Sequence, residues 1–322
     1  MDVLITEDLS APAIQRLAQN RSVTFEPALW KDPAQLKAKI AGARAVMVRN
    51  QTQVTAEILA AAPNLLAIGR VGVGLDNLNL QAATERGVVV IAPLNANATS
   101  VAELTIGLML GLARKLAFSD RSTKGGGWDR KGCTGVELDR KTVAICGLGR
   151  IGRMVALRAR AFGMKLVVFD PFVKVDSPVL LELNAHLAQS LPEAVSAADF
   201  VTVHSPLTAE TRHMFNEKTF GAMKPGSFFI NTSRGGVMDE QGLLSALRSG
   251  HLGGAALDVR EVEPPKARSD FEQMDNVILT PHIGAFTTEA QTRTFEAVCD
   301  DIEHVLRGEP AVNYVNIPSP KR

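Results

Sequence analysis

The sequence has almost no net charge and no long apolar run. It contains 35 Lys and Arg residues against 34 Asp and Glu residues, which leaves a net charge of +1. This balance argues against a large nucleic-acid-binding surface, because such a surface needs a concentrated basic face. The most apolar stretch, residues 100–116, carries Glu103, Arg114 and Lys115. It is short for a bilayer span, so we expect a buried helix there, or one shared with a partner subunit.

Cysteine is also scarce. Cys133, Cys146 and Cys299 are far apart and lack the spacing of metal ligands, so we expect no metal site. Reduced thiols are typical of cytoplasmic proteins, which is the location we expect. The first residues, MDVLITEDLS, do not combine a basic segment with an apolar core, so we expect no signal peptide.

Short β-rich runs alternate with helical patterns in two series, and the 322 residues are enough for two domains. Alternation of this kind predicts βαβ units and parallel sheets. The first series has expected strands at residues 3–6, 45–48, 65–68 and 88–91, with a helix near residues 55–62. The second series has expected strands at residues 142–146, 165–169, 200–204, 227–230, 254–258 and 277–279.

Two helix starts carry capping signals. Ser10 precedes Pro12, so Ser10 is the expected N-cap of the first helix. The last helix is expected to begin at Thr287 or Thr288, where Thr288 and Gln291 have capping-box spacing, and to stop at Gly308.

A glycine pattern, Gly147-Leu-Gly149-Arg-Ile-Gly152, lies between an expected strand and an expected helix. Asp170 lies eighteen residues beyond Gly152, at the end of the next strand. This context favours a dinucleotide-binding loop over an unrelated glycine turn. The helix N-terminus would present N–H groups to the pyrophosphate. A carboxylate at Asp170 accepts hydrogen bonds from a ribose 2′-hydroxyl and repels a 2′-phosphate, so NAD is favoured over NADP.

Three candidate catalytic residues follow expected strands of the second series: Arg234, Glu263 and His282. Each alone has an ordinary alternative, such as a surface charge or a turn residue. Together, downstream of the glycine pattern, they suit oxidation of a 2-hydroxy acid. The guanidinium can bind a carboxylate bidentately, and the imidazole can take the hydroxyl proton as a hydride leaves. The glutamate can orient the imidazole and stabilise its charged form.

With these motifs the chain resembles the D-isomer-specific 2-hydroxyacid dehydrogenase family over nearly its whole length. The motifs similar to those of the family lie at residues 68–77, 97–103, 127–128, 135–138 and 204–208. The resemblance implies an α/β fold of two doubly wound parallel-sheet domains. A Rossmann NAD-binding domain, residues 99–288, would be inserted in a flavodoxin-like substrate-binding domain, residues 1–98 and 289–322. It also implies an NAD-dependent enzyme that is a homodimer.

The fingerprint and the resemblance together assign site residues. The catalytic residues would be Arg234, Glu263 and His282. The cofactor-binding residues would be Gly147, Gly149, Arg150, Ile151, Gly152, Asp170, Thr99, Ser100, His204, Ser205, Pro206, Thr211, Thr232, Ser233, Arg234, Asp258, His282 and Gly284. The substrate-binding residues would be Arg49, Arg70, Val73, Gly74, Asn97, Arg234 and His282, with Arg130 from the neighbouring subunit.

Within the family the chain is most similar to the 3-phosphoglycerate dehydrogenase branch, and we expect a short form without the C-terminal regulatory domain. Arg49 and Arg70 fall on arginines that bind the distal phosphate in that branch, which implies a dianionic substrate. Phe286 departs from the pattern, because a small polar residue is usual there. The acid itself stays open: sulfolactate, malate, hydroxypyruvate or glyoxylate are alternatives.

A different class of relative also resembles this chain. The NADH-sensing transcriptional corepressors keep the arginine, glutamate and histidine, so these residues do not exclude a binding protein. Such proteins work through additional partner-binding surfaces and tails, and we see no disordered tail here. We therefore expect an enzyme.

Overall fold

The computed structural model describes residues 1–321. The chain divides into two compact units, Met1–Asn97 with Ala285–Arg322 and Ala98–Gly284. The chain therefore leaves the first unit once and returns to it near its end, which hydrophobic periodicity alone does not reveal.

The first unit is built on a five-stranded parallel sheet with the order β2-β1-β3-β4-β5. This is the order of flavodoxin-like sheets. Its strands are β1 Val3–Ile5, β2 Val23–Phe25, β3 Ala45–Val48, β4 Ala67–Arg70 and β5 Val89–Ile91. Four of them were predicted, and β2 was missed because it has only three residues, none of them fully buried.

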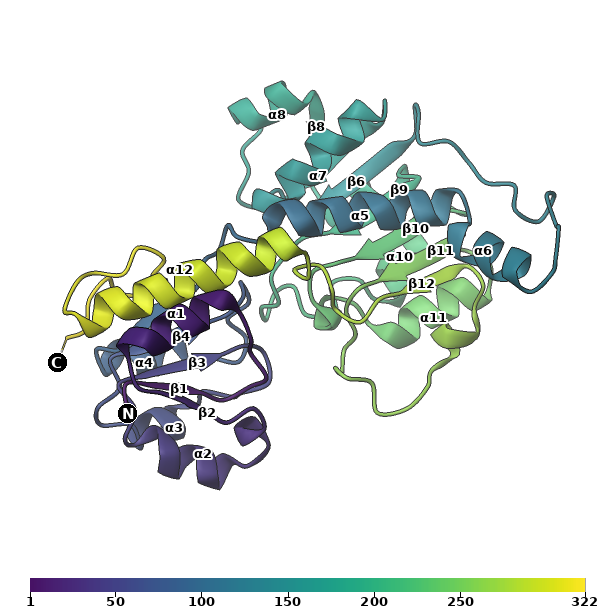
Figure 1. Ribbon diagram of the computed structural model, residues 1–322. Helices are drawn as coiled ribbons and strands as arrows, with labels where there is room; N and C mark the ends of the chain where they lie inside the picture. Colours follow the sequence, from purple (N-terminus) through teal and green to yellow (C-terminus); the bar gives the residue numbers. More distant parts are fainter. Residues whose placement is uncertain (322) are drawn as a thin grey trace. The chain divides into compact units, whose positions relative to one another are not determined.

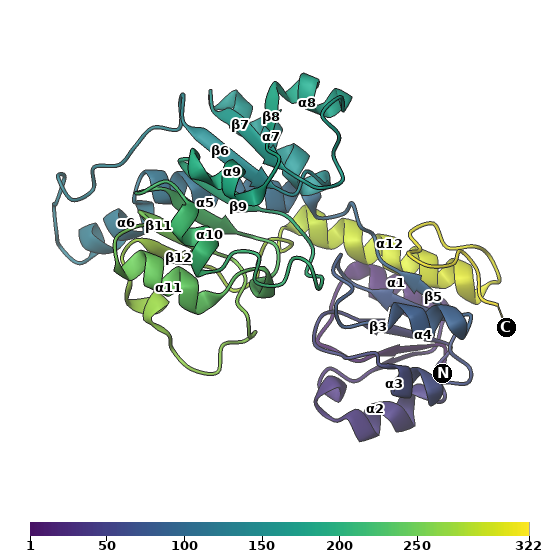
Figure 2. The same ribbon diagram turned by 180° about the vertical axis from the view of Figure 1, so that it is seen from behind.

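Helices cover both faces of this sheet (Figures 1 and 2). Successive strand residues point to opposite faces, so Val3 and Ile5 pack with α1 and α12 while Leu4 packs with α2 and α3. The helices are α1 Pro12–Asn20, α2 Pro33–Ile40, α3 Ala56–Ala60, α4 Leu80–Glu85 and α12 Thr288–Leu306, with a 3₁₀ turn η1 at Leu29–Lys31. Figure 1 shows α12, in yellow, running alongside α1.

Both predicted capping arrangements differ from the structure. The N-cap of α1 is Ala11, without a side-chain hydrogen bond, and Pro12 alone starts the helix. The N-cap of α12 is Thr287, whose hydroxyl accepts from Ala290 N at 3.1 Å. Gln291 therefore forms no capping box with Thr288. Its amide instead donates to the Ala285 carbonyl at 2.6 Å, because Thr287 already occupies the cap.

The second unit contains a seven-stranded parallel sheet with the order β12-β11-β10-β9-β6-β7-β8. Its first six strands have the Rossmann order, which β12 extends by one strand. The strands are β6 Thr142–Cys146, β7 Lys165–Phe169, β8 Ala185–Leu187, β9 Phe200–Val203, β10 Phe228–Asn231, β11 Gly254–Leu257 and β12 Val277–Leu279. Only β8 was missed, again a three-residue strand without a fully buried residue.

Two layers of helices sandwich this sheet. One face packs with α5, α7 and α8 and the other with α9, α10 and α11. The helices are α5 Ala98–Ala113, α6 Leu116–Lys124, α7 Arg150–Ala161, α8 Pro178–Leu183, α9 Leu191–Ser196, α10 Glu217–Ala222 and α11 Glu240–Arg248, with 3₁₀ turns η2 Gly235–Val237 and η3 Asp270–Gln273. Most of α5 is buried, which confirms the expected buried helix.

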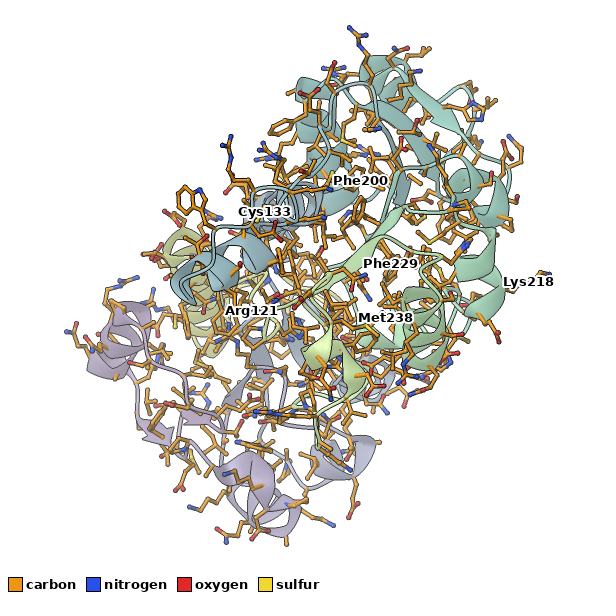
Figure 3. The ribbon with its side chains drawn as sticks, turned by 90° about the vertical axis from the view of Figure 1, so that its right-hand side faces the viewer. Arg121, Cys133, Phe200, Lys218, Phe229 and Met238 are labelled. Atoms are coloured by element: carbon orange, nitrogen blue, oxygen red, sulfur yellow. The ribbon has the colours of Figure 1, made fainter. Side chains whose placement is uncertain are left out.

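Aromatic rings fill the second unit's core. Phe229 lies 4.9 Å from Phe215 and 5.2 Å from Phe220 between ring centroids, and Phe200 stacks on Phe228 at 5.0 Å. Figure 3 shows Phe200 and Phe229 within the interior of this unit. Among residues 1–321, no helix is both long and apolar enough to cross a membrane.

Candidate active site

The glycine loop between β6 and α7 is shaped by close backbone approaches. Gly147 has φ +100°, and a Cβ there would lie 2.9 Å from the His204 carbonyl carbon, at the point where β6 and β9 adjoin. A Cβ at Gly152 would collide with the Gly147 carbonyl oxygen. Gly149 is the N-cap of α7, has no side-chain cap, and faces open space. The first N–H groups of α7 are therefore available to a phosphate.

Asp170 ties the end of β7 to this loop. Its Oδ2 accepts from Leu148 N at 2.7 Å and its Oδ1 accepts from Phe172 N at 2.9 Å. Each carboxylate oxygen can accept a further hydrogen bond, so Asp170 can still bind a ribose hydroxyl. The loop and the carboxylate thus fit a dinucleotide.

The segment after β9 borders the same loop. Thr211 Oγ1 donates to the Pro206 carbonyl at 2.6 Å, and Ser205 Oγ donates to the Cys146 carbonyl at 3.4 Å. His204 Nε2 lies 3.1 Å from Thr202 Oγ1. Part of His204 reaches solvent, yet burial lowers its pKa to about 3, so the ring is neutral near pH 7.

Further predicted cofactor residues lie on α5, α7 and the turn after β10. Thr232 Oγ1 lies 2.9 Å from Thr105 Oγ1, which links that turn to the buried helix α5. Thr99 Oγ1 is 3.9 Å from Met154 Sδ, and Ser233 Oγ donates to Asn231 Oδ1 at 3.0 Å. Arg150 and Ile151 open α7, and Ser100 lies buried on α5.

His282 and Glu263 form a direct pair. His282 Nδ1 lies 2.6 Å from Glu263 Oε2. Burial raises the pKa of Glu263, but the hydrogen bond and charge of His282, the Arg260 N–H and the charge of Arg234 outweigh it, and the net pKa is lowered. Glu263 is therefore an ionised acceptor near pH 7, so the proton between the two groups belongs to His282 Nδ1. Neutral His282 then leaves Nε2 as its acceptor atom.

Arg234 begins the short η2 turn after β10. Its Nη1 donates to the Ser233 carbonyl at 2.7 Å, while Asn231 Nδ2 donates to the Arg234 carbonyl at 2.9 Å. The charge of Arg234 is the smallest of the causes that lower the pKa of Glu263, so Arg234 contributes to the electrostatic surroundings of the His282–Glu263 pair. The strands that precede these three residues all end at the same edge of the sheet.

Asp258 fixes the turn that carries His282. The carboxylate is 1% exposed; Oδ1 accepts from Thr280 Oγ1 at 2.6 Å and from Ile283 N at 2.8 Å, and Oδ2 accepts from Gly284 N at 2.8 Å. His282 itself has φ +54°, in the left-handed region that non-glycine residues rarely adopt. Asp258 thus holds an unusual backbone conformation in place from both sides of His282.

Arg260 is a site residue that sequence reasoning missed. Its Nε and Nη2 donate to the two oxygens of Glu240 at 2.9 and 3.0 Å, and its Nη1 donates to Glu272 at 3.2 Å. Its backbone N–H donates to Glu263 Oε1 at 2.9 Å. This ion-pair network anchors the loop that presents Glu263. Nothing in the local run of charges distinguishes Arg260 from a surface arginine.

In the first unit, a buried glutamate that the sequence analysis did not single out organises residues 49–52. Glu7 is 3% exposed, and its oxygens accept from the backbone N–H groups of Arg49, Gln51 and Thr52 at 2.7, 3.2 and 2.9 Å. Asn77 Nδ2 donates to the carbonyls of Arg49 and Thr52 at 3.1 and 2.7 Å. The loop is therefore held through its backbone from two sides.

The Arg49 side chain projects from this loop. Its guanidinium carbon lies 4.1 Å from the Phe286 ring centroid, and its Nη2 donates to Gln291 Oε1 at 3.2 Å. Burial lowers the pKa of Arg49, whereas the charge of Glu7 raises it.

The other predicted substrate residues of the first unit lie in two loops. Arg70 is 8% exposed and its Nη1 donates to the Val71 carbonyl at 3.2 Å. Gly72, with φ +144°, makes room for that guanidinium, because a Cβ there would collide with it. The loop continues to Val73 and Gly74. Asn97 Oδ1 is buried without a hydrogen-bond partner among residues 1–321.

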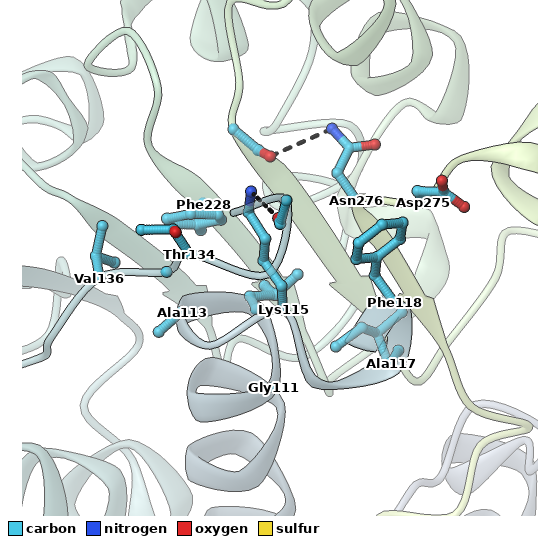
Figure 4. Close-up of a pocket in the computed structure, with 15 residues that line it drawn as sticks. Gly111, Ala113, Lys115, Ala117, Phe118, Thr134, Val136, Phe228, Asp275 and Asn276 are labelled. Carbon is cyan, nitrogen blue, oxygen red and sulfur yellow. Dashed lines mark hydrogen bonds between the residues drawn. The ribbon is translucent and has the colours of Figure 1, made fainter. Parts of the chain in front are cut away.

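A cavity of about 250 Å³ lies elsewhere in the second unit (Figure 4). Phe228, Gly253 and Asn276, at the starts of β10, β11 and β12, form part of its wall, and Lys115 donates to the Gly132 carbonyl at its rim. The cavity is at the amino ends of the strands, opposite the edge that carries His282. The exposed Arg130 follows in the neighbouring segment. We therefore do not assign this cavity to the chemistry.

The neutrality of His204 makes stability depend on pH. The unfolded chain binds more protons than the folded chain between the lowered pKa of about 3 and the ordinary value of 6.5. The contribution of His204 to the free energy of unfolding is therefore complete above about pH 6.5. It falls as the pH drops, by at most about 1.4 kcal/mol per pH unit. Urea midpoints of the chain and of His204→Gln, measured from about pH 6.5 to pH 5, should show a shallower loss for the variant. Equal slopes would contradict this role for His204.

Comparison with known proteins agrees with this geometry. Residues 106–284 match the family model described as D-isomer specific 2-hydroxyacid dehydrogenase, NAD binding domain. The D-3-phosphoglycerate dehydrogenase of Methanocaldococcus jannaschii is 43% identical over 317 residues, 98% of this chain and 60% of that enzyme. The chain thus spans about 60% of the length of the first curated relatives that it matches.

Two solved structures extend the match to the fold. The TT0316 protein from Thermus thermophilus superposes with a TM-score of 0.90 at 33% identity, covering 98% of this chain and 100% of that one. D-lactate dehydrogenase from Aquifex aeolicus, solved with NAD and lactic acid, superposes with a TM-score of 0.87 at 29% identity, covering 99% and 100%. The resemblance predicted from sequence motifs is confirmed: this chain belongs to the D-isomer specific 2-hydroxyacid dehydrogenase family and contains the family's NAD-binding domain.

Proposed function

We propose that this chain is an NAD-dependent dehydrogenase that transfers a hydride between nicotinamide and C2 of a small D-2-hydroxy acid. The observation that carries the proposal is the His282–Glu263 pair, with Arg234 acting on the same carboxylate. The pair belongs to the sheet whose first loop has the shape of a dinucleotide site. We assign the second unit to cofactor binding and catalysis and the first unit to substrate binding.

The proton chemistry follows from the tautomer of His282. With Nδ1–H held by ionised Glu263, Nε2 is free to take the hydroxyl proton of the acid while the hydride leaves C2. Bound NAD would supply the hydride acceptor. In the reverse direction, doubly protonated His282 returns the proton from Nε2 to the substrate oxygen. Glu263 stabilises the imidazolium in either direction, and its lowered pKa keeps it ionised.

Three groups would bind and orient the reactants. Arg234 presents a planar guanidinium that suits the substrate carboxylate. The uncapped N-terminus of α7 at Gly149 suits the pyrophosphate, and Asp170 favours a ribose 2′-hydroxyl over a 2′-phosphate. We assign the other predicted cofactor residues to the same site.

For the substrate we propose an acid with a second anionic group, similar to 3-phosphoglycerate. Arg49 supports this assignment, because its partly buried guanidinium contacts only neutral side chains among the described residues. Arg70, Val73, Gly74 and Asn97 would complete the first unit's contribution, and Arg130 would act from a second copy. The identity to D-3-phosphoglycerate dehydrogenases also supports this class. Sulfolactate- or malate-type acids and hydroxypyruvate or glyoxylate are the alternatives.

The proposal is tested by NADH consumption with phosphohydroxypyruvate, sulfopyruvate, oxaloacetate, hydroxypyruvate, glyoxylate and pyruvate. We expect fast turnover of a dianionic member. His282→Ala should lower kcat by about 100- to 10,000-fold, the usual contribution of general acid–base catalysis. His186→Ala is a matched control, because His186 forms an exposed pair with Glu193 at 3.4 Å. NADH binding without turnover of any acid would refute the enzyme and favour an NADH sensor.

Asp258→Asn tests the support of His282. The amide can replace only one oxygen acceptor, so its NH₂ group would face the Gly284 N–H or the donors on the other side. Loss of a buried charge-assisted hydrogen bond costs roughly 1.5–3 kcal/mol. If the lost hydrogen bond raises the activation free energy by the same amount, kcat falls about 10- to 100-fold. An unchanged kcat, with NADH affinity retained, would show that the His282 turn does not need this carboxylate.

We further propose that the chain forms a cytoplasmic homodimer. Trp128 is 81% exposed, and Leu116 and Val136, near the apolar cavity, are 55% and 39% exposed. Apolar side chains exposed this fully are typical of interfaces. The three cysteines are free thiols, which suits a reducing compartment. Light scattering should give twice the 34.5 kDa of one chain, and Trp128→Asp should shift the mass toward one chain. A single-chain mass for the parent protein would refute the dimer.

A further inference from the structure

We propose that Phe286 is a specificity-determining residue, which holds the Arg49 guanidinium ready for the second anionic group of the substrate. The inference rests on the proposed function and adds a residue that neither the fingerprint nor the catalytic pattern assigns.

The geometry is that of a cation stacked on an aromatic face. The guanidinium carbon of Arg49 lies 4.1 Å from the ring centroid of Phe286, within the range of about 6 Å for an attractive contact. Phe286 is 56% exposed, so burial of the ring in a core does not account for its position. The ring makes no hydrogen bond to the cation, and among residues 1–321 only Nη2 of the guanidinium donates, to Gln291, so the other N–H groups can bind other partners.

Gln291 hydrogen-bonds both to the Arg49 side chain and to the backbone next to Phe286. Its Oε1 accepts from Arg49 Nη2 at 3.2 Å, and its Nε2 donates to the Ala285 carbonyl at 2.6 Å, directly before Phe286. One amide side chain therefore connects the guanidinium to the backbone that carries the ring. Such a closed set of contacts reduces the number of rotamers open to Arg49, and an anion then loses less entropy when it binds.

The charge of Arg49 has no ion-pair partner among residues 1–321. The charge of Glu7 raises the pKa of Arg49, but the Glu7 oxygens already accept the backbone N–H groups of Arg49, Gln51 and Thr52. Burial removes water from the guanidinium, and its contacts with Phe286 and Gln291 are both neutral. A partly desolvated cation of this kind gains most from an anion.

The class of ligand follows from the shape of the free donors. A guanidinium that lies over a ring and donates from one nitrogen still has N–H groups on its other nitrogens, and these lie in one plane, which matches two oxygens of a phosphate, sulfonate or carboxylate. Simple 2-oxo acids have one carboxylate, which we assign to Arg234. Phe286 should therefore affect the affinity for dianionic acids and leave that for monoanionic acids nearly unchanged.

The test compares KM for phosphohydroxypyruvate and for pyruvate in Phe286→Ala, Phe286→Leu and Phe286→Tyr. Loss of the aromatic face should raise KM for the dianion by about 3- to 30-fold in the Ala and Leu variants. Tyr should behave as the parent, and KM for pyruvate should change less than about twofold. Arg49→Ala gives the full effect of losing the guanidinium. Phe25→Ala is a matched control, because Phe25 is a 47% exposed phenylalanine of the same unit.

Equal changes in KM for both acids, or no change in either, would overturn the inference while leaving the dehydrogenase intact. If no acid is turned over, the proposed function fails, and binding of inorganic phosphate then decides the inference. Phosphate should raise the melting temperature of the parent chain and of Phe286→Tyr most, that of Phe286→Ala less, and that of Arg49→Ala least, because the N-terminus of α7 can bind phosphate in every variant. The same phosphate-induced shift in the parent and Phe286→Ala would refute a role for the ring.

Discussion

The hydrogen bond between His282 and Glu263 determines what the second unit can do. It fixes which imidazole nitrogen carries a proton, and it requires two loops, after β11 and after β12, to meet. Apart from the short 3₁₀ turn η3, these loops contain no helix or strand that would hold the two side chains together. Asp258 supplies the geometry on the histidine side through three hydrogen bonds, and Arg260 supplies it on the glutamate side through two carboxylates. Asp258 and Arg260 therefore hold His282 and Glu263 at hydrogen-bonding distance.

The first unit holds its own polar loop by a related principle. A buried carboxylate accepts backbone N–H groups in both units, Glu7 at residues 49–52 and Asp258 at the His282 turn. In each case the fixed backbone carries one side chain of the proposed site, a cation in the first unit and an imidazole in the second. Rigid support of this kind places a group accurately while leaving its reactive atoms exposed to a ligand.

Much of this was predictable from the sequence, because the strands that carry the site are short, continuous apolar runs with turn residues after them. The glycine fingerprint and the Arg234, Glu263 and His282 positions are local signals. The strands β2 and β8 were missed because three residues without full burial give no periodic signal. The N-cap of α1 was placed one residue too early, and the Thr288–Gln291 capping box does not form, although α12 begins at Thr288 as predicted. Glu7, Arg260 and the Arg49–Phe286 contact join distant residues, and no spacing rule reveals them.

The backbone anchoring of residues 49–52 also bears on how this protein can evolve. Glu7 and Asn77 bind N–H and carbonyl groups that every residue type except proline possesses. The side chains of Asn50 and Gln51 are exposed and take no part in those bonds. Mutations at these two positions can accumulate with little loss of folding, beside a cation that is already in place. If the proposed function holds, the loop is a tolerant region in which lineages, or a directed-evolution library, can explore new acids while the scaffold stays intact.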